Sequence, residues 1–276
     1  MPRIDAKVAS LTHSVLDAEI REYQALLDAK SAEQQVHDFL AGRSYFFNGE
    51  LRMFGASPLY SKVRLGSDFE VDFAWFDTGS SGAEWRFVEI EAPSRPMFTK
   101  SGQPSSWLNH ALQQVRDWHT WIHENLDYAR KLMPYVEYPL AYVVVGRRSD
   151  LTSTSAKRLK RLCYEHRQYA QIHTLDWLTD LAGSAHNLIS DAGGCWPIPA
   201  RAFSHADLRQ QKPDFAFQWL HSPYPKEMAT EGLQERLDDR EYAHEHNEDV
   251  RAIIGPSLDE LLSEIPEEGD LSTDRS

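Results

Sequence analysis

Residues 69–76 read FEVDFAWF and residues 85–92 read WRFVEIEA, with a Gly/Ser-containing stretch between them. Polar and apolar side chains alternate along both segments, which is typical of β-strands with one buried face. A short polar linker between two such segments predicts an antiparallel hairpin. The alternation puts Glu70 and Asp72, and likewise Glu89 and Glu91, on one face. The opposite face carries Val71, Phe73, Trp75, Val88 and Ile90.

The hairpin brings carboxylates from its two strands together. If it closes symmetrically about its loop, Asp72 faces Glu89 and Glu70 faces Glu91. Directly opposed residues have Cβ atoms about 5 Å apart, and like charges at that separation repel. A hard divalent cation with oxygen ligands would remove the repulsion. The alternative is that this face is open to water and the acids are solvated. The strongly apolar neighbours and the convergence of two strands favour the metal site.

Further elements surround the hairpin. Residues 6–29 predict an amphipathic helix, and the capping box Ser31-Ala32-Glu33-Gln34 predicts the start of a second helix. The remaining predicted elements are a strand at 58–66, a long helix at 106–126, a buried strand at 139–147, a basic helix at 154–166, a short strand at 171–174 and a helix at 175–188. This order predicts an α/β fold in which helices flank a mixed β-sheet.

The negative charge is concentrated at one end of the chain. The 276 residues carry a net charge of −13, and residues 226–276 hold 16 Asp/Glu against 5 Lys/Arg. The other 225 residues carry 26 acids and 24 bases, so the body can still present a basic face. We predict four regions: an N-terminal helix (1–30), the main domain (31–190), an irregular extension (191–225) and an acidic, poorly ordered tail (226–276).

Composition and missing motifs restrict the class of protein. No apolar run approaches the length of a membrane span, and the first residues lack a signal core. Two isolated cysteines, Cys163 and Cys195, suggest reduced thiols in the cytoplasm rather than disulfides or a zinc site. The absence of G-x-x-x-x-G-K-[ST] and G-x-S-x-G motifs argues against an NTPase and a nucleophile-elbow hydrolase.

The order of the motifs resembles a known family. An acid at Asp72, then Glu89-Ile90-Glu91 on the next strand, then a helix bearing Gln114 and Trp118, resembles the PD-(D/E)XK nuclease core. More narrowly, GSDFEVDFAWF, FVEIEAPSRPMFTKSG and HALQQVRDW resemble the nuclease domain of Shedu anti-phage defence proteins, over about residues 30–190. This resemblance implies a restriction-endonuclease-like fold and DNA cleavage that depends on Mg²⁺ or Mn²⁺.

The resemblance also implies roles for individual residues. Asp72 and Glu89 match the metal-binding acids, and the carbonyl of Ile90 would add a ligand. Gln114 matches the glutamine on the helix beside the site. Glu33 matches an acid on the preceding helix, although a first-turn helix position explains an acid there equally well.

Glu91 departs from the family pattern, which usually has a lysine at this position. Glu91 would then act as a general base or as a second metal ligand. Alternatively a lysine arrives from elsewhere, and Lys100 in FTKSG is the nearest candidate, unless it is an ordinary solvated lysine. Loss of activity is the third possibility.

A basic cluster indicates where a nucleic acid would bind. The densest group of bases lies between residues 147 and 161, and Arg95 follows the acidic strand; the candidate phosphate contacts are Arg95, Arg147, Arg148, Lys157, Lys160 and Arg161. The alternative is a solvated helix face. His119 and His123 stand one helical turn apart but lack a third metal ligand.

These observations predict a cytoplasmic, metal-dependent DNA endonuclease of anti-phage defence, without a membrane partner. We expect a homo-oligomer, because regulated assembly is one way to restrain such an enzyme. The main alternative is a catalytically inactive module that binds nucleic acid or a phage component and signals by assembly. A glycosidase is disfavoured because no aromatic sugar platform is evident. We hypothesise that the acidic tail mimics DNA, in which case deleting residues 226–276 raises DNA affinity.

Overall fold

The computed structural model describes residues 8–47, 59–79, 82–191, 193–194, 196–199 and 202–210. The chain forms two compact units, Met1–Asp77 with Ala83–Lys212 and Thr78–Gly82 with Pro213–Ser276. Apart from residues 78, 79 and 82, every described residue belongs to the first unit. The predicted acidic tail lies outside the described residues.

A six-stranded mixed sheet forms the centre of the first unit, with the strand order β6-β5-β4-β3-β2-β8. Its strands are β2 (Tyr60–Leu65), β3 (Phe69–Gly79), β4 (Gly82–Ile90), β5 (Leu140–Val144), β6 (Ala170–His173) and β8 (Phe203–Ser204). Strands β4, β5 and β6 are parallel, whereas β2 and β3 are antiparallel. Only residues 80 and 81 separate β3 from β4, so these neighbours must also run antiparallel. The predicted α/β class with a mixed sheet is confirmed.

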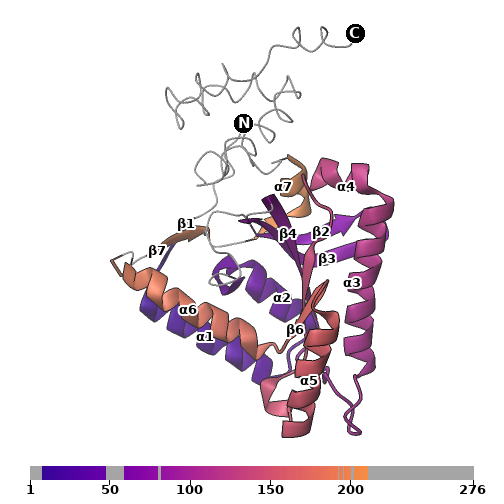
Figure 1. The fold of residues 1–276 in the computed structure, drawn as a ribbon. Coiled ribbons are helices and arrows are strands. Elements are labelled where there is room, and N and C mark those ends of the chain that lie inside the picture. Colours follow the sequence, from indigo (N-terminus) through magenta and orange to yellow (C-terminus); the bar gives the residue numbers. More distant parts are fainter. Residues whose placement is uncertain are drawn as a thin grey trace, which may run out of the picture. The chain divides into compact units, whose positions relative to one another are not determined.

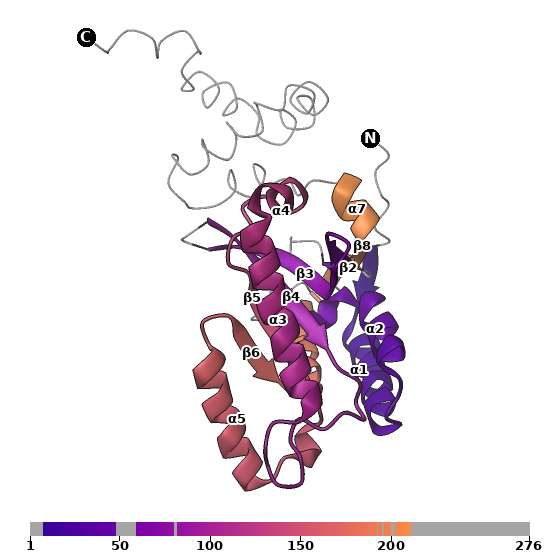
Figure 2. The same ribbon diagram turned by 90° about the vertical axis from the view of Figure 1, so that its right-hand side faces the viewer.

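Helices cover both faces of this sheet (Figures 1 and 2). Helices α1 (His13–Asp28), α2 (Glu33–Ala41) and α6 (Asp176–Asp191) lie on one face, and α3 (Ser106–Glu124) and α4 (Leu126–Leu132) lie on the other. The remaining described helices are α5 (Ser153–His166), α7 (His205–Gln210) and the 3₁₀ helices η1 (Ser44–Phe47) and η2 (Arg148–Asp150). Within the described residues, no helix combines the length and apolarity needed to cross a membrane.

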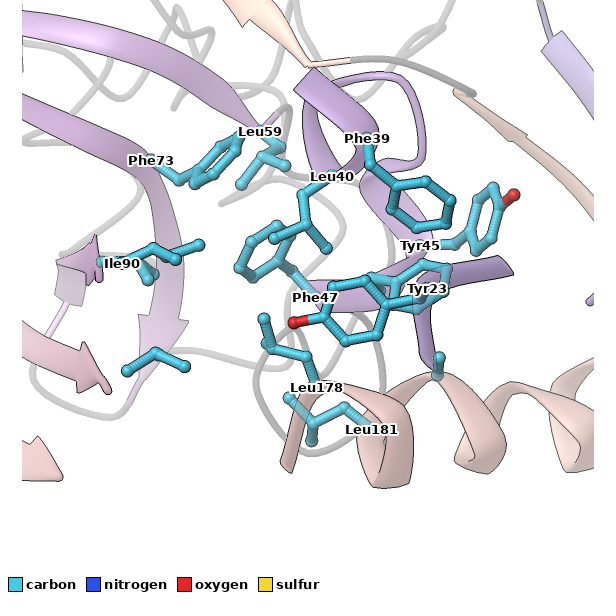
Figure 3. Packing of buried hydrophobic residues seen from close by; sticks show 14 of the residues in the cluster. Tyr23, Phe39, Leu40, Tyr45, Phe47, Leu59, Phe73, Ile90, Leu178 and Leu181 are labelled. Carbon is cyan, nitrogen blue, oxygen red and sulfur yellow. The ribbon is translucent and has the colours of Figure 1, made fainter. Parts of the chain in front are cut away.

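One layer of the core lies between the sheet and helices α1, α2 and α6. Phe73 and Ile90 extend from the strands toward Leu40, Phe47 and Leu178 of the helical layer (Figure 3). All five side chains are at most 1 % exposed, and burial of such a side chain stabilises the fold by about 1.5–3 kcal/mol. Because side chains alternate along a strand, these apolar residues turn their acidic neighbours to the opposite face.

Helix α3 covers the acidic face of the hairpin. The ring centroids of Phe87 on β4 and Trp118 on α3 lie 5.9 Å apart, edge to face. Ser105 starts the helix, because its hydroxyl accepts a hydrogen bond from the Leu108 N–H over 3.2 Å. Helix α3 therefore packs on the face of β4 that Phe87 shares with Glu89.

Two predicted element boundaries are wrong. The helix predicted at 6–29 begins only at His13, after the N-cap Thr12, and Val8–Leu11 form β1. Strand β1 pairs with β7 (Trp196–Pro199), a partner that no local pattern can indicate. The segment 191–225 was predicted to be irregular, yet its described part contains β7, β8 and α7.

The second helix begins one residue later than the capping box predicted, because its N-cap is Ala32 and not Ser31. Helix α2 starts at Glu33, and the Gln35 side chain accepts a hydrogen bond from the Ala32 N–H over 3.0 Å. The first helix is also not separate from the main domain, because Leu16, Tyr23 and Leu27 of α1 belong to the common core.

Candidate functional site

Three carboxylates of the hairpin are buried side by side. Asp72, Glu89 and Glu91 are 7 %, 8 % and 2 % exposed, respectively. Glu70, nearer the start of β3, is exposed. Burial of the three acids excludes the explanation that this face of the hairpin is open to water. Each of these acids must therefore either meet a compensating group or bind a proton.

Both carboxylate oxygens of Asp72 are engaged by the neighbouring strands. The Lys62 ammonium on β2 lies 2.6 Å from Oδ1, and the Ile90 backbone N–H on β4 donates to Oδ2 over 2.8 Å. These two bonds hold Asp72 between its neighbours on either side.

Lys62 reaches Asp72 from an unusual backbone conformation. Ser61 and Val63 pair with Phe73 and Val71, so Lys62 stands opposite Asp72 across the two strands. Its φ is +52°, in the left-handed region that side-chain-bearing residues rarely adopt in a strand. Such conformations cost on the order of 1–3 kcal/mol and cluster at functional sites.

The charge environment keeps Lys62 protonated. Partial burial lowers the pKa of the ammonium, but Asp72, Glu70 and Glu89 together raise the pKa above its ordinary value. The ammonium therefore acts as a permanent internal cation beside the acids across the physiological pH range.

Glu89 is the acid without a counterion. Its carboxylate makes no ion pair or hydrogen bond with any residue that the structure describes. Burial, followed by the charges of Asp72, Glu91 and Glu33, raises the pKa of Glu89 well above the ordinary value, and Lys62 opposes this only in part. A buried carboxyl with a raised pKa beside other acids is the group that an external cation would stabilise most.

Glu91 is held by an arginine from the following loop. The Arg95 guanidinium contacts Glu91 and also lies 2.6 Å from Glu33 at the start of α2. It stacks over the Trp107 ring, 4.1 Å from the ring centroid. Burial raises the pKa of Glu91, and the contact with Arg95 partly opposes this rise. Glu33, Arg95 and Glu91 thus form one continuous network.

The donor set suits a hard cation in its chemistry, but the acids do not converge on one point. Carboxylate oxygens are the ligands that Mg²⁺ and Mn²⁺ prefer. Across the described part of the chain, however, no three His, Cys, Asp or Glu side chains are arranged to hold a metal ion. Asp72 is turned to Lys62 and Ile90, and Glu91 is turned to Arg95. Two side-chain cations occupy the counterion role instead.

Two of the predicted site residues do not contact the acids. Gln114 is half-buried on α3, and the described residues show no hydrogen bond from it to Asp72, Glu89 or Glu91. Lys100 is exposed on the loop after the hairpin and, within the same described set, makes no ion pair with an acid. It lines a cavity of about 390 Å³ between this loop and the start of α5.

The two arginines before α5 that were predicted to contact phosphate both pair with acids. Arg147 bridges Asp28 and Asp176 over 2.9 and 3.0 Å. Burial raises the pKa of the Asp176 carboxyl, but the pairing with Arg147 outweighs this and holds the pKa below its ordinary value. Arg147 thus ties α1 and the start of α6 to the segment after β5. Arg148 pairs with Asp180 on the surface, where both side chains are more than half exposed and the pair stabilises the fold little.

Helix α5 retains basic side chains on its surface. Arg161 pairs with Glu165 over 3.3 Å, one helical turn away. Lys157 and Lys160 are exposed, and neither has an acidic partner within the described ranges. These two lysines are the best-placed members of the predicted basic cluster to meet a phosphate backbone.

Lys62 is the site residue that sequence reasoning missed. Residues 58–66 were predicted as a strand, but its pairing with the next strand was not followed. Extending the antiparallel pattern by one strand would have placed Lys62 opposite Asp72. Lys62 is far from Glu91 in sequence, but it is the lysine that reaches the acids in space.

These features define an α/β protein with a buried, cation-holding carboxylate site on its central sheet. The family described as Shedu protein SduA, C-terminal, matches residues 30–178, over half of the chain. The chain therefore belongs to this family, and membership implies a role in anti-phage defence. The matched region contains the complete acid cluster with Lys62 and Arg95. No match is found among curated proteins.

Proposed function

We propose that the chain is a metal-dependent DNA endonuclease of anti-phage defence with a restriction-endonuclease-like, PD-(D/E)XK core. The observation that carries this proposal is the cluster of Asp72, Glu89 and Glu91, buried on adjacent strands inside the region of family similarity. The burial of three acids on one sheet face costs folding free energy, which indicates that a cation or a reaction requires them.

The proposed chemistry assigns a role to each acid. Asp72 and Glu89 bind Mg²⁺ or Mn²⁺, the Ile90 carbonyl adds a ligand, and Glu91 serves as a second ligand or as general base. A metal ion bound there would polarise the phosphodiester and lower the pKa of a bound water. Gln114, on the helix that covers this face, supports the site from the side.

The arrangement of elements supports a DNA substrate. The acidic hairpin is followed by a covering helix and a parallel strand, in the order that the family resemblance implies. Lys157 and Lys160 on α5 offer sequence-independent contacts to phosphates. Together with membership of a defence family, these features favour nucleic acid over a small phosphate ester as substrate.

One observation favours the alternative function of a binding module without catalysis. Glu91 stands where the family pattern has lysine, and Arg95 holds it in an ion pair. The acids are also not arranged around one point in the described residues. A protein that keeps this arrangement when DNA is present would bind nucleic acid or a phage component without cutting it.

Plasmid cleavage tests the proposal. We expect the wild type to cleave DNA with Mg²⁺ or Mn²⁺ and Asp72→Asn to lose about 100-fold or more of that rate, because a ligand charge is removed. Asp68→Asn, an exposed change in the turn before β3, is the matched control and should keep the wild-type rate. Equal rates for wild type and Asp72→Asn, or no cleavage by wild type with any divalent metal, would reject catalysis.

A further inference from the structure

Two side-chain cations contact the buried acids: Lys62 holds Asp72, and Arg95 holds Glu91. We propose that Lys62 and Arg95 are exchangeable counterions: they hold Asp72 and Glu91 in the metal-free protein, and they become contacts for a substrate phosphate once a divalent cation takes those carboxylates. This inference rests on the proposed function, and it adds two substrate-binding residues and a reason for their ion pairs.

The first argument is that the acids outnumber the side-chain cations beside them. Asp72, Glu89 and Glu91 are buried on one face of the sheet, and Glu33 shares Arg95 with Glu91. A phosphodiester carries a negative charge and would be repelled by such a cluster. The anionic phosphodiester can approach only if the positive charge at the site exceeds the negative charge of the acids. A divalent cation together with two released side-chain cations supplies that excess.

The second argument is the difference in burial between the acids and their cations. The side chains of Asp72 and Glu91 are 10 % and 3 % exposed, whereas those of Lys62 and Arg95 are 35 % and 31 % exposed. The acids are therefore fixed in the interior, and the cations stand at the solvent side. Long side chains at that position can turn outward without any change in the backbone.

The third argument is that each cation already has a second contact to move to. Arg95 stacks on the exposed ring of Trp107, and this contact does not depend on Glu91. The Lys62 ammonium lies 3.6 Å from exposed Glu70 as well as 2.6 Å from Asp72. Lys62 stands opposite Asp72 in the β2–β3 pairing and has a φ of +52°, a conformation that clusters at functional sites.

The exchange predicts a reciprocal coupling between metal and DNA. A metal ion that frees the two cations strengthens DNA binding, and DNA must strengthen metal binding by the same factor. A variant without one of the cations loses that coupling. It binds metal at least as tightly as wild type, because no internal cation has to be displaced from the carboxylate.

The experiment uses the full-length chain. Mn²⁺ binding is measured by calorimetry, and binding of a phosphorothioate DNA duplex is measured by fluorescence anisotropy with Mn²⁺ or with EDTA. For the wild type we expect Mn²⁺ to raise DNA affinity about tenfold. Lys62→Met and Arg95→Met should bind Mn²⁺ with equal or higher affinity and lose most of the tenfold gain. Lys131→Met, which removes an exposed lysine from α4, should behave as wild type.

Lys62→Gly secures the result against misfolding, because glycine adopts a φ of +52° without strain and removes the same ammonium. It should fold and lack the coupling. If Mn²⁺ binds and all variants keep the wild-type coupling, the inference is overturned while the endonuclease proposal stands. If the wild type binds no Mn²⁺ at all, both are overturned.

Discussion

The carboxyl group of Glu89 links stability to protonation in this protein. It is buried beside Asp72 and Glu91, and its pKa is raised well above the ordinary value of 4.5. Between the ordinary pKa and the raised pKa of Glu89, the folded state therefore binds more protons than the unfolded state. As pH rises through that interval, ionisation of Glu89 works against folding, and the penalty is complete above the raised pKa. In the metal-free protein this group is a source of instability at neutral and alkaline pH.

Replacement of Glu89 by its neutral isostere should therefore stabilise the protein in a pH-dependent way. We expect Glu89→Gln to be more stable than wild type by about 1–3 kcal/mol at pH 8 in EDTA, because no charge has to be buried. The difference should shrink as pH falls toward 4.5. Urea unfolding at several pH values measures it, and Glu124→Gln reports the effect of removing an exposed carboxylate. A difference that stays constant with pH would contradict the assignment.

At the scale of elements, the site depends on how the loop after β4 docks against the end of β5. Gly146 follows β5 with a φ of +70°, and a Cβ there would lie 3.0 Å from the Met97 backbone nitrogen and 3.6 Å from the Arg95 carbonyl oxygen. Only glycine permits both the conformation and this close approach. The docking fixes the backbone from which Arg95 reaches Glu91 and Glu33, so a glycine outside the site controls the geometry within it.

Two glycine substitutions should therefore have opposite effects. Gly146→Ala should destabilise the protein by about 1–3 kcal/mol, because it combines a left-handed residue with a backbone clash. Gly183→Ala, inside α6 with no atom within 4 Å of the added methyl, should stabilise by about 0.5–1 kcal/mol. Thermal or urea unfolding measures both. If Gly146→Ala is neutral or stabilising, the loop after β4 does not need its close contact with Gly146.

At the scale of the whole molecule, the basic side chains between residues 147 and 160 include two groups with different surroundings. Arg147 and Arg148 join separate parts of the fold through Asp28, Asp176 and Asp180. Lys157 and Lys160 remain exposed on α5. A sequence-level count treats all of these as one basic cluster, but only the exposed lysines can meet phosphates without breaking an internal ion pair.

DNA binding at increasing salt separates the two groups. The double variant Lys157→Gln/Lys160→Gln should weaken binding and reduce the slope of log affinity against log salt by about 2, one for each lost phosphate contact. Arg147→Gln should leave the slope unchanged and lower the free energy of unfolding by about 1–3 kcal/mol, because it leaves Asp176 unpaired. An unchanged slope in the double variant would place the DNA interface elsewhere.

Local patterns of polar and apolar residues predicted much of the fold. Alternation in residues 69–76 and 85–92 predicted both strands of the hairpin and the face that each side chain takes, because strand side chains alternate with a period of two. The same pattern put Asp72, Glu89 and Glu91 on one face among apolar neighbours. Strand β1 was missed, because its partner β7 lies nearly the whole described chain away.

The sequence by itself determined the α/β class, the acidic hairpin and the family, because these depend on local periodicity and on the order of short motifs. Only the tertiary structure decided which cations meet the acids. Lys62 faces Asp72 because β2 lies beside β3, and Arg95 bridges Glu91 and Glu33 because a loop and a helix meet at the sheet. Ion pairs between distant residues depend on strand order and loop docking, which long-range packing sets and local spacing does not encode.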